Sequence, residues 1–333
     1  MESWGTPEPT AYFDYDLGSL LCENKVFTFA TFTTTVLYSL VLLLSLGGNS
    51  LVLWVLVKYE NLESLTNLFI LNLCLSDLVF SCLLPVWVST YYWGWVLGEL
   101  LCKVLSMTFS VSLYSSAFFL TLMTVHRYLA VVRPLSTLRV HTLRCRVLLT
   151  AAVWAASVLS SIPEAISHEV IESQCTYAQM RGLLASVYQH NIFFLLSMTT
   201  ILFCYVQILR TLLRSRSKQR PRTVRLIFTI VVAYFLSWAP YNLIMFLQTL
   251  VSIGVIQSCE TSQRLEFMVL VCRNLAFSQC CFNPVLYVFV GVKFRRHLKS
   301  LLQQARPCQP QVPSPAPLLR SPGAFTYEGP SFY

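Results

Sequence analysis

Charge is scarce in this sequence. Asp, Glu, Lys and Arg make up 12% of its 333 residues, whereas hydrophobic residues make up 55%. A soluble globular domain carries about 25% charged residues. The low share of charge therefore excludes an ordinary water-soluble fold and indicates a membrane protein.

Further absences narrow the class of protein. The N-terminus lacks a basic region followed by a short apolar stretch and a cleavage site, so we expect no removable signal peptide. No Asn-x-Ser/Thr sequence is present, so we expect no N-glycosylation. The two halves of the chain share no repeated polar breaks, which argues against a transporter. "HEVIE" at 168–172 lacks the second histidine of a zinc-protease motif, and we expect no enzyme activity.

Seven long stretches without a charged residue dominate what is present. A helix rises 1.5 Å per residue, so about 20 apolar residues cross the roughly 30 Å hydrocarbon core of a bilayer. The connections are short, so neighbouring helices should pack antiparallel in one bundle. We predict an all-α membrane protein, a seven-transmembrane-helix bundle. The uncharged stretches are 26–57, 78–98, 104–125, 147–163, 182–209, 226–259 and 274–292.

The basic residues are distributed unevenly between the two sides of this bundle. If the N-terminus is outside, nineteen of the 24 Lys and Arg residues fall on the inner side. This bias follows the positive-inside rule and predicts an extracellular N-terminus on a multi-pass protein. The net charge of +9 therefore reflects topology and does not indicate a nucleic-acid partner.

The segments outside the bundle differ from it in composition. Residues 1–25 form an acidic tail that we expect to be disordered and extracellular. The bundle follows at 26–292. Residues 293–304 alternate basic and apolar residues, which predicts a short amphipathic eighth helix on the inner leaflet of the lipid bilayer. Residues 305–333 are rich in Pro and Ser and should form a disordered cytoplasmic tail.

Polar residues and prolines interrupt the apolar pattern at a few positions. Asp77 lies near the middle of the second predicted helix, where an ionised carboxylate costs several kcal/mol unless it faces the bundle interior. It is either a hydrogen-bonded structural acid or a site for a small cation. Pro240 and Pro284 each remove a backbone hydrogen bond from a helix. Two such breaks favour a bundle with two arrangements.

The motifs in the seven helices, taken together, resemble those of the rhodopsin-like G-protein-coupled receptors. They are "GNSLV", "LSDL", Cys102, "HRY" at 126–128, Trp154, "SWAP" and "NPVLY" at 283–287. "QCCFNPVLYVFVGVKFR" and a second pair of outer cysteines are similar to the chemokine receptors within that family. "HRY", "VYQHNIFFLLS" and "LVKYENLESLTN" are most similar to the XC class of chemokine receptors.

This resemblance implies a protein ligand at the outer end. Four outer cysteines can form two disulfides in an oxidising compartment, and the resemblance pairs Cys102 with Cys175 and Cys22 with Cys259. The acidic tail would meet the basic surface of a lymphotactin-type chemokine. For an aromatic residue in a membrane helix, simple packing is the alternative role. The implied ligand-binding residues are Tyr12, Asp14, Tyr15, Asp16, Tyr38, Trp87, Phe109, Tyr241 and Arg273.

The resemblance also implies a heterotrimeric G-protein of the inhibitory class at the inner end, with receptor kinases and arrestin at the tail, in the plasma membrane. Calcium signalling and chemotaxis would follow. No cofactor is expected, apart from an allosteric sodium ion at Asp77, Ser116 and Asn283. The implied activation residues are His126, Arg127, Tyr128, Tyr205, Trp238, Pro240, Asn283, Pro284 and Tyr287.

Two departures from the family pattern affect these expectations. His126 stands where most relatives have an acid that holds Arg127 by a charge-assisted hydrogen bond. Histidine has a reference pKa of about 6.5 and is mostly neutral at cytoplasmic pH, so we expect a weaker resting restraint and raised basal coupling. Arg273 stands where many CC-class relatives have Glu, which inverts the charge of the pocket. The alternative function is a scavenger that binds and internalises chemokine without activating a G-protein.

Overall fold

The computed structural model describes residues 24–133, 142–214, 221–256 and 259–285, and the side chains in these ranges except those of 24–30, 221–227, 259–260 and 262–263. The described helices are long and the only described sheet has two strands. In chain order the elements are α2 (Asn24–Tyr59), α3 (Leu65–Trp93), α4 (Gly98–Val132), α5 (Leu143–Ser167), β1 (His168–Ile171), β2 (Gln174–Tyr177), α6 (Met180–Arg214), α7 (Pro221–Ser252), α8 (Cys259–Phe277) and the 3₁₀ helix η2 (Ser278–Cys281).

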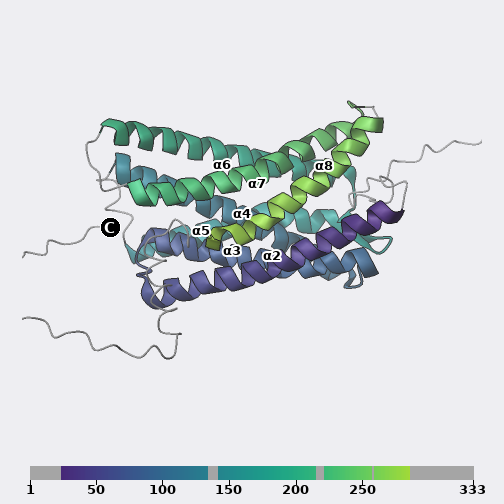
Figure 1. Cartoon of the computed structure of the whole chain (residues 1–333), viewed down its shortest axis with the longest axis horizontal. Coiled ribbons are helices and arrows are strands. Elements are labelled where there is room, and N and C mark those ends of the chain that lie inside the picture. Colours follow the sequence, from purple (N-terminus) through teal and green to yellow (C-terminus); the bar gives the residue numbers. More distant parts are fainter. Residues whose placement is uncertain (1–23, 134–141, 215–220, 257–258, 286–333) are drawn as a thin grey trace, which may run out of the picture.

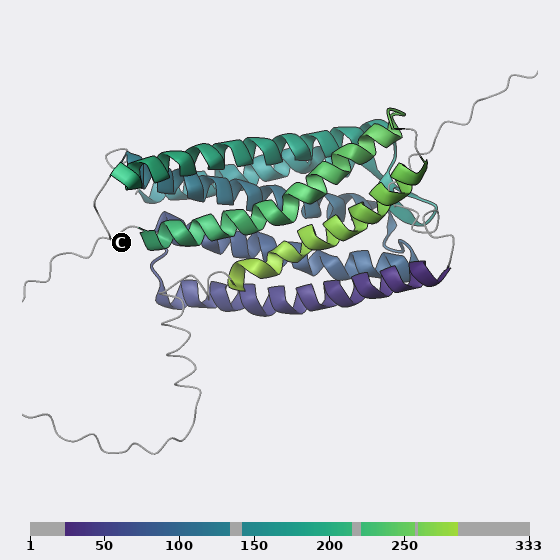
Figure 2. The ribbon, with the colours of Figure 1, turned by 45° about the horizontal axis from the view of Figure 1, so that its top comes forward.

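The helices lie side by side along the long axis of the molecule (Figures 1 and 2). Seven of them are long and apolar enough to cross a membrane, which confirms the predicted seven-transmembrane-helix bundle. The strands β1 and β2 form an antiparallel hairpin at one end of the bundle. We call this the hairpin end, and the other the opposite end, where α4 finishes.

Two helices begin well before the uncharged stretches that predicted them. α3 begins at Leu65, whereas the predicted stretch began at 78, after Asp77. α8 begins at Cys259, whereas the predicted stretch began at 274, after Arg273. Both charged side chains lie inside the bundle rather than at its surface, so a charge does not mark a helix end here. The uncharged stretch after Asp77 thus covers only part of α3, as the predicted place of Asp77 near the middle of that helix requires.

The bundle is apolar outside and carries a line of polar side chains within. On α2, Leu40 and Leu43 are exposed, whereas Asn49 is fully buried. Asn72 and Asp77 of α3 are likewise buried. Without water around the helices, buried polar groups must bond to one another, and helices that carry them associate through these bonds.

A local break interrupts the last helix just before Pro284. Pro284 has no N–H to donate to the carbonyl four residues earlier, that of Cys280. Asn49 of α2 supplies the missing donor, because its Nδ2 donates to Cys280 O at 2.9 Å. Gly48 allows this close approach, since a Cβ there would lie 2.8 Å from Pro284 Cβ. The proline break predicted from sequence is therefore satisfied by a neighbouring helix.

A disulfide and a backbone hydrogen bond are among the contacts that hold the hairpin over the bundle. A disulfide joins Cys175 of β2 to Cys102 of α4, with a Cα–Cα distance of 5.5 Å, which confirms this predicted pair. The Trp95 backbone N–H donates to Ser173 O at 2.6 Å. Gly94 adopts φ +65°, and a Cβ there would lie 2.9 Å from Ser173 O, so this position requires glycine. The hairpin is thus fixed at the rim of the bundle.

Several sequence-based predictions concern residues outside the described part of the chain. They are the acidic tail with Tyr12, Asp14, Tyr15 and Asp16, the Cys22–Cys259 disulfide, Tyr287, the amphipathic helix at 293–304 and the tail at 305–333. These remain predictions.

Candidate functional site

A cavity of about 200 Å³ opens at the hairpin end of the bundle. All seven helices and both strands contribute side chains to its wall. Tyr38, Trp87, Phe109, Tyr241 and Arg273, which the family resemblance indicated as ligand-binding residues, all line it. The structure therefore brings these five residues from α2, α3, α4, α7 and α8 into one site.

Aromatic rings form the floor of this cavity. Trp87 and Phe109 meet edge to face with ring centroids 5.9 Å apart. Phe109 in turn contacts Phe277 at 5.2 Å, and Phe277 contacts Trp238 at 6.5 Å. Aromatic pairs at 4.5–7 Å add about 0.5–1.5 kcal/mol beyond burial. Phe277 thus links the cavity to Trp238, as Tyr241 and His190 also do, and the sequence analysis missed this role of Phe277.

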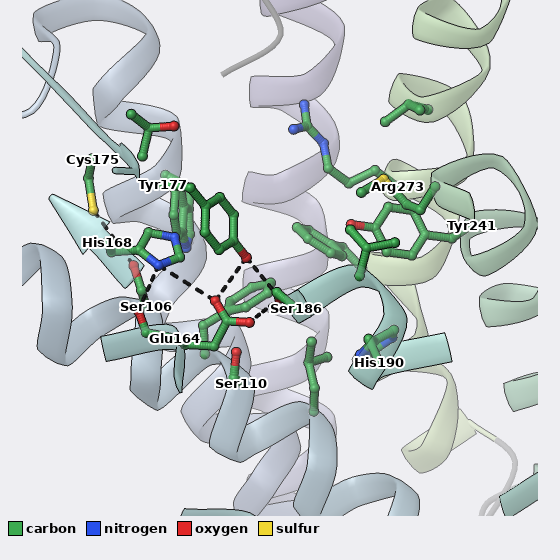
Figure 3. Close-up of a pocket in the computed structure, with 18 of the residues that line it drawn as sticks. Ser106, Ser110, Glu164, His168, Cys175, Tyr177, Ser186, His190, Tyr241 and Arg273 are labelled. Atoms are coloured by element: carbon green, nitrogen blue, oxygen red, sulfur yellow. Dashed lines mark hydrogen bonds and ion pairs between the residues drawn. The ribbon is translucent and has the colours of Figure 1, made fainter. Parts of the chain in front are cut away.

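Arg273 supplies positive charge on one wall. Its Nη2 donates to the Tyr91 hydroxyl at 2.8 Å, so the side chain extends from α8 towards α3. Figure 3 shows Arg273 beside Tyr241, on the far side of the cavity from the hairpin. This wall can bind an acceptor such as a carboxylate or a backbone carbonyl.

Glu164 of α5 supplies negative charge on the facing wall (Figure 3). The Tyr177 hydroxyl donates to Glu164 Oε2 at 2.8 Å, and the Ser186 hydroxyl donates to Glu164 Oε1. His168 Nδ1 lies 2.8 Å from the Glu164 carbonyl oxygen and 3.5 Å from Oε2. These residues, which we call the Glu164 cluster (Glu164, His168, Tyr177, Ser186), were not predicted as site residues.

Burial sets the protonation states of two members of the cluster. Burial lowers the pKa of His168 below its ordinary value, and the neighbouring Glu164 opposes this only in part. The imidazole is therefore neutral at pH 7. Burial and the Glu164 carboxylate raise the pKa of the Tyr177 hydroxyl well above its ordinary value, so the hydroxyl keeps its proton and acts as a donor. "HEVIE" thus contributes one hydrogen-bonding histidine, and the described residues hold no cluster of three or more His, Cys, Asp or Glu side chains for a metal.

A second, small cavity lies deeper in the bundle, around Asp77. Its volume is about 10 Å³, which is close to the space of one water-sized particle. Ser116, Trp238 and Gln279 line it. Asn283 Nδ2 donates to Asp77 Oδ2 at 2.7 Å. The structure therefore brings the three residues of the predicted sodium site close together, with one carboxylate among neutral groups.

Arg127 lies at the opposite end of the bundle, near the end of α4. Its Nη2 donates to Thr66 Oγ1 of α3 at 2.6 Å. The preceding His126 packs its ring edge to face against Phe69, with centroids 6.4 Å apart. Tyr205 is buried on α6 in the same end and contacts Phe228 of α7 at 5.3 Å. The hydroxyl of Thr66 was not predicted as a partner of Arg127.

The remaining predicted activation residues occupy different levels of the bundle. Tyr128 packs against Phe203 with ring centroids 6.0 Å apart. Pro240 lies inside α7, two residues after the buried Trp238. Trp238 lines the deep cavity and contacts rings of the outer one, so it lies between the two. The predicted residues thus follow the axis of the bundle from the cavity to Arg127.

Comparison with known proteins assigns this arrangement to a family. A family model described as "7 transmembrane receptor (rhodopsin family)" matches residues 48–287. Chemokine XC receptor 1 of Homo sapiens is 70% identical over 333 residues, which cover 100% of both chains. The chain belongs to the chemokine receptors of the rhodopsin family. This receptor is thus a multi-pass membrane protein of a signalling family rather than an enzyme.

The other relatives place the receptor nearer to the XC class than to the CC class. Chemokine XC receptor 1 of Mus musculus is 69% identical over 326 residues, covering 97% of this chain and 99% of the relative. C-C chemokine receptor type 8 of Homo sapiens is 37% identical over 308 residues, covering 89% of this chain and 86% of the relative. The difference confirms the XC-class resemblance that the sequence motifs indicated.

Proposed function

We propose that this receptor binds an XC-class chemokine, lymphotactin, at its hairpin end and activates a heterotrimeric G-protein of the inhibitory class at its opposite end. The observation that carries the ligand class is the 70% identity to Chemokine XC receptor 1 along the whole chain. The receptor lies in the plasma membrane with its N-terminus and hairpin outside. Calcium signalling and chemotaxis are the expected cellular responses.

The positions of the cavity and of Arg127 support ligand binding at the hairpin end and G-protein binding at the opposite end. The cavity has a volume of about 200 Å³, and Cys175, which ties the hairpin to α4, is among the residues that line it. Arg127 lies about 25 residues further along the same helix. At 1.5 Å per residue this separation is of the order of the bilayer thickness. Ligand and G-protein therefore contact different faces of the membrane.

We propose that the two ends communicate by a population shift. A ligand that binds one arrangement of the bundle better than the other moves the equilibrium towards it, and a G-protein that binds the same arrangement is linked reciprocally. Phe277 and Trp238 are suited to carry the shift, because their rings connect the outer cavity to the one around Asp77. Pro240 weakens α7 close to these rings.

A sodium ion at Asp77 is part of this proposal. Ser116 supplies a neutral oxygen atom near the Asp77 carboxylate, and hard cations prefer oxygen ligands. Asn283 donates its Nδ2 to Asp77 Oδ2, so its amide would have to turn to offer its oxygen to an ion. Gln279 also lines this cavity and its Nε2 lies 3.4 Å from Asn283 Oδ1. An ion there would favour the arrangement in which these groups stay close together.

The proposed function is tested by ligand-driven nucleotide exchange on an inhibitory-class G-protein, in membranes that carry the receptor. Lymphotactin and a panel of CC and CXC chemokines are the probes. Exchange driven by lymphotactin alone supports the proposal. Arg127→Ala should abolish exchange while surface binding of lymphotactin persists, apart from the loss of G-protein-linked high affinity.

A scavenger function is the second candidate, and His126 is the residue that favours it. The family position usually holds an acid, so its replacement could accompany a loss of coupling. Arg127 and Tyr205 oppose this reading because both are retained and lie in the same end of the bundle. Chemokine binding and internalisation without exchange would identify a scavenger.

A further inference from the structure

The outer cavity contains one carboxylate and one guanidinium among its described lining residues, those of Glu164 and Arg273. They belong to α5 and α8, and Figure 3 shows them on facing walls, with the Tyr241 hydroxyl directed towards the space between. A cationic group of a bound peptide is attracted to the Glu164 wall, and an anionic group to the Arg273 wall. The cavity thus orients a bound group by its charge.

The Glu164 carboxylate is held by neutral donors. The Tyr177 hydroxyl lies 2.8 Å from Oε2 and 2.9 Å from Ser186 Oγ, while Ser186 contacts Oε1. Tyr177 and Ser186 have one hydroxyl proton each, so only two of these three oxygen–oxygen contacts can hold a hydrogen bond at a time. An ionised carboxylate accepts about four hydrogen bonds. The cluster therefore fixes the carboxylate in position and leaves part of its acceptor capacity open.

The carboxylate also lacks a permanently charged counter-ion within the described part of the receptor. Its ion-pair contact is His168, at 3.5 Å. The burial that lowers the pKa of His168 keeps that ring neutral at pH 7. Glu164 is only 6% exposed, and a buried charge is costly unless it is paired. A cation that enters the cavity would supply the missing partner.

We propose that Glu164 binds a positively charged nitrogen that the N-terminal segment of the ligand carries into the cavity. The proposal rests on the proposed function and names the contact that orients the ligand. The cation lies against α5, and an acceptor of the same segment lies against Arg273 on α8. Tyr177 and Ser186 are positioning residues, because they hold the carboxylate rather than the ligand.

Glu164→Gln tests the proposal on the receptor side, since it removes the charge and keeps the shape. Truncating one partner of a buried charge pair is strongly unfavourable, so we expect the concentration of lymphotactin for half-maximal exchange to rise about tenfold or more. Glu169→Gln is the matched control. It removes a carboxylate five residues further along the chain, in β1, but Glu169 is exposed and does not line the cavity, so potency should stay unchanged. Both variants are compared at equal surface levels.

The ligand side gives a second test that needs no receptor variant. Lymphotactin with an acetylated N-terminus lacks the α-ammonium group, and a second form has neutral residues in place of every basic side chain in its N-terminal segment. On the wild-type receptor one of these forms should lose about tenfold in potency, which identifies the nitrogen. On Glu164→Gln the same form should lose nothing further, because the partner charge is already absent.

The outcomes separate this proposal from the proposed function. If lymphotactin drives no exchange on the wild-type receptor, the proposed function fails. If it does so, and Glu164→Gln keeps wild-type potency, the proposal for Glu164 is overturned and the function stands. Should the variant not reach the cell surface, full potency of both altered ligands on the wild-type receptor overturns the proposal equally well.

Discussion

Arg127 at the end of α4 donates a hydrogen bond from Nη2 to Thr66 Oγ1 of α3, and the two atoms lie 2.6 Å apart. A neutral hydroxyl thus holds the arginine, in a position where an acid would hold it more strongly. His126, adjacent in sequence, packs against Phe69 instead. Rotation of the Arg127 side chain alone would therefore break this hydrogen bond between α3 and α4.

Thr66→Val should raise basal nucleotide exchange, because it removes the hydroxyl and keeps the branched shape. A hydrogen bond to a charged group contributes about 1.5–3 kcal/mol, so the equilibrium between the resting and active arrangements should shift by about tenfold or more. Exchange is measured without ligand, at equal receptor levels. Thr121→Val is the control, since the Thr121 hydroxyl bonds to Ala117 O of its own helix. Equal basal exchange in Thr66→Val and wild type would show that this bond does not restrain Arg127.

His126→Asp should lower basal exchange. The introduced carboxylate lies next to Arg127 in sequence and can hold the guanidinium by a charge-assisted bond, which is stronger than a neutral one. His126→Asn is the neutral control and should leave basal exchange near the wild-type level. Unchanged basal exchange in the aspartate variant would contradict the view that His126 weakens the resting restraint.

The sequence predicts the number of helices well because the uncharged stretches follow bilayer thickness. It predicts their boundaries poorly where a charged side chain turns inward. The uncharged stretches that follow Asp77 and Arg273 are shorter than α3 and α8, although Asp77 itself was expected near the middle of its helix. Glu164 directly follows the uncharged stretch 147–163, yet it is buried in the cavity wall. Like Asp77, Glu164 is a charged residue next to a long apolar stretch, and this pattern indicates a buried charge in both cases.

The partners of these residues are harder to predict than the residues themselves. Tyr177 meets Glu164 because the hairpin folds back over the bundle, and Ser186 meets it because α6 packs beside α5. Asn49 and Cys280 are 231 residues apart in sequence, and their bond depends on how α2 packs against the last helix. Such contacts follow from tertiary packing, which no local pattern contains. The family resemblance supplied the aromatic pocket residues, but it did not supply the Glu164 cluster.

Sodium should reduce agonist affinity if it binds at Asp77. Lymphotactin binding is compared at equal ionic strength with sodium or with a large organic cation that cannot enter a cavity of about 10 Å³. Affinity should be lower in sodium for the wild-type receptor. Asp77→Asn should remove this difference, because the carboxylate is the charged ligand of the site. A sodium effect of the same size in the variant would place the ion elsewhere.

Loss of the Cys102–Cys175 disulfide should reduce both stability and ligand binding. The bond joins residues 73 apart in sequence and fixes the hairpin at the cavity rim. Removing a native disulfide typically costs about 2–5 kcal/mol. The double variant Cys102→Ser, Cys175→Ser leaves no unpaired thiol at the site. We expect a lower melting temperature in detergent and weak lymphotactin binding, whereas Cys82→Ser, which removes an exposed free thiol, should change neither.

Acidification should destabilise the receptor through His168. Its pKa in the folded protein lies below the reference value of about 6.5, because burial disfavours the charged ring. Between these two values the unfolded chain binds more protons than the folded one, so stability falls as the pH drops below about 6.5. Above pH 7 the ring is neutral in both states and contributes no pH dependence.

His168→Asn should weaken this dependence, since the amide can donate to the Glu164 carbonyl as Nδ1 does and does not titrate. The measurement is the melting temperature in detergent between pH 5 and pH 7.5. The two curves should run in parallel above pH 7 and diverge below pH 6.5, where the wild type loses more. Parallel curves over the whole range would mean that His168 titrates alike in the folded and unfolded states. Its burial beside Glu164 would then make no contribution to the pH dependence of stability.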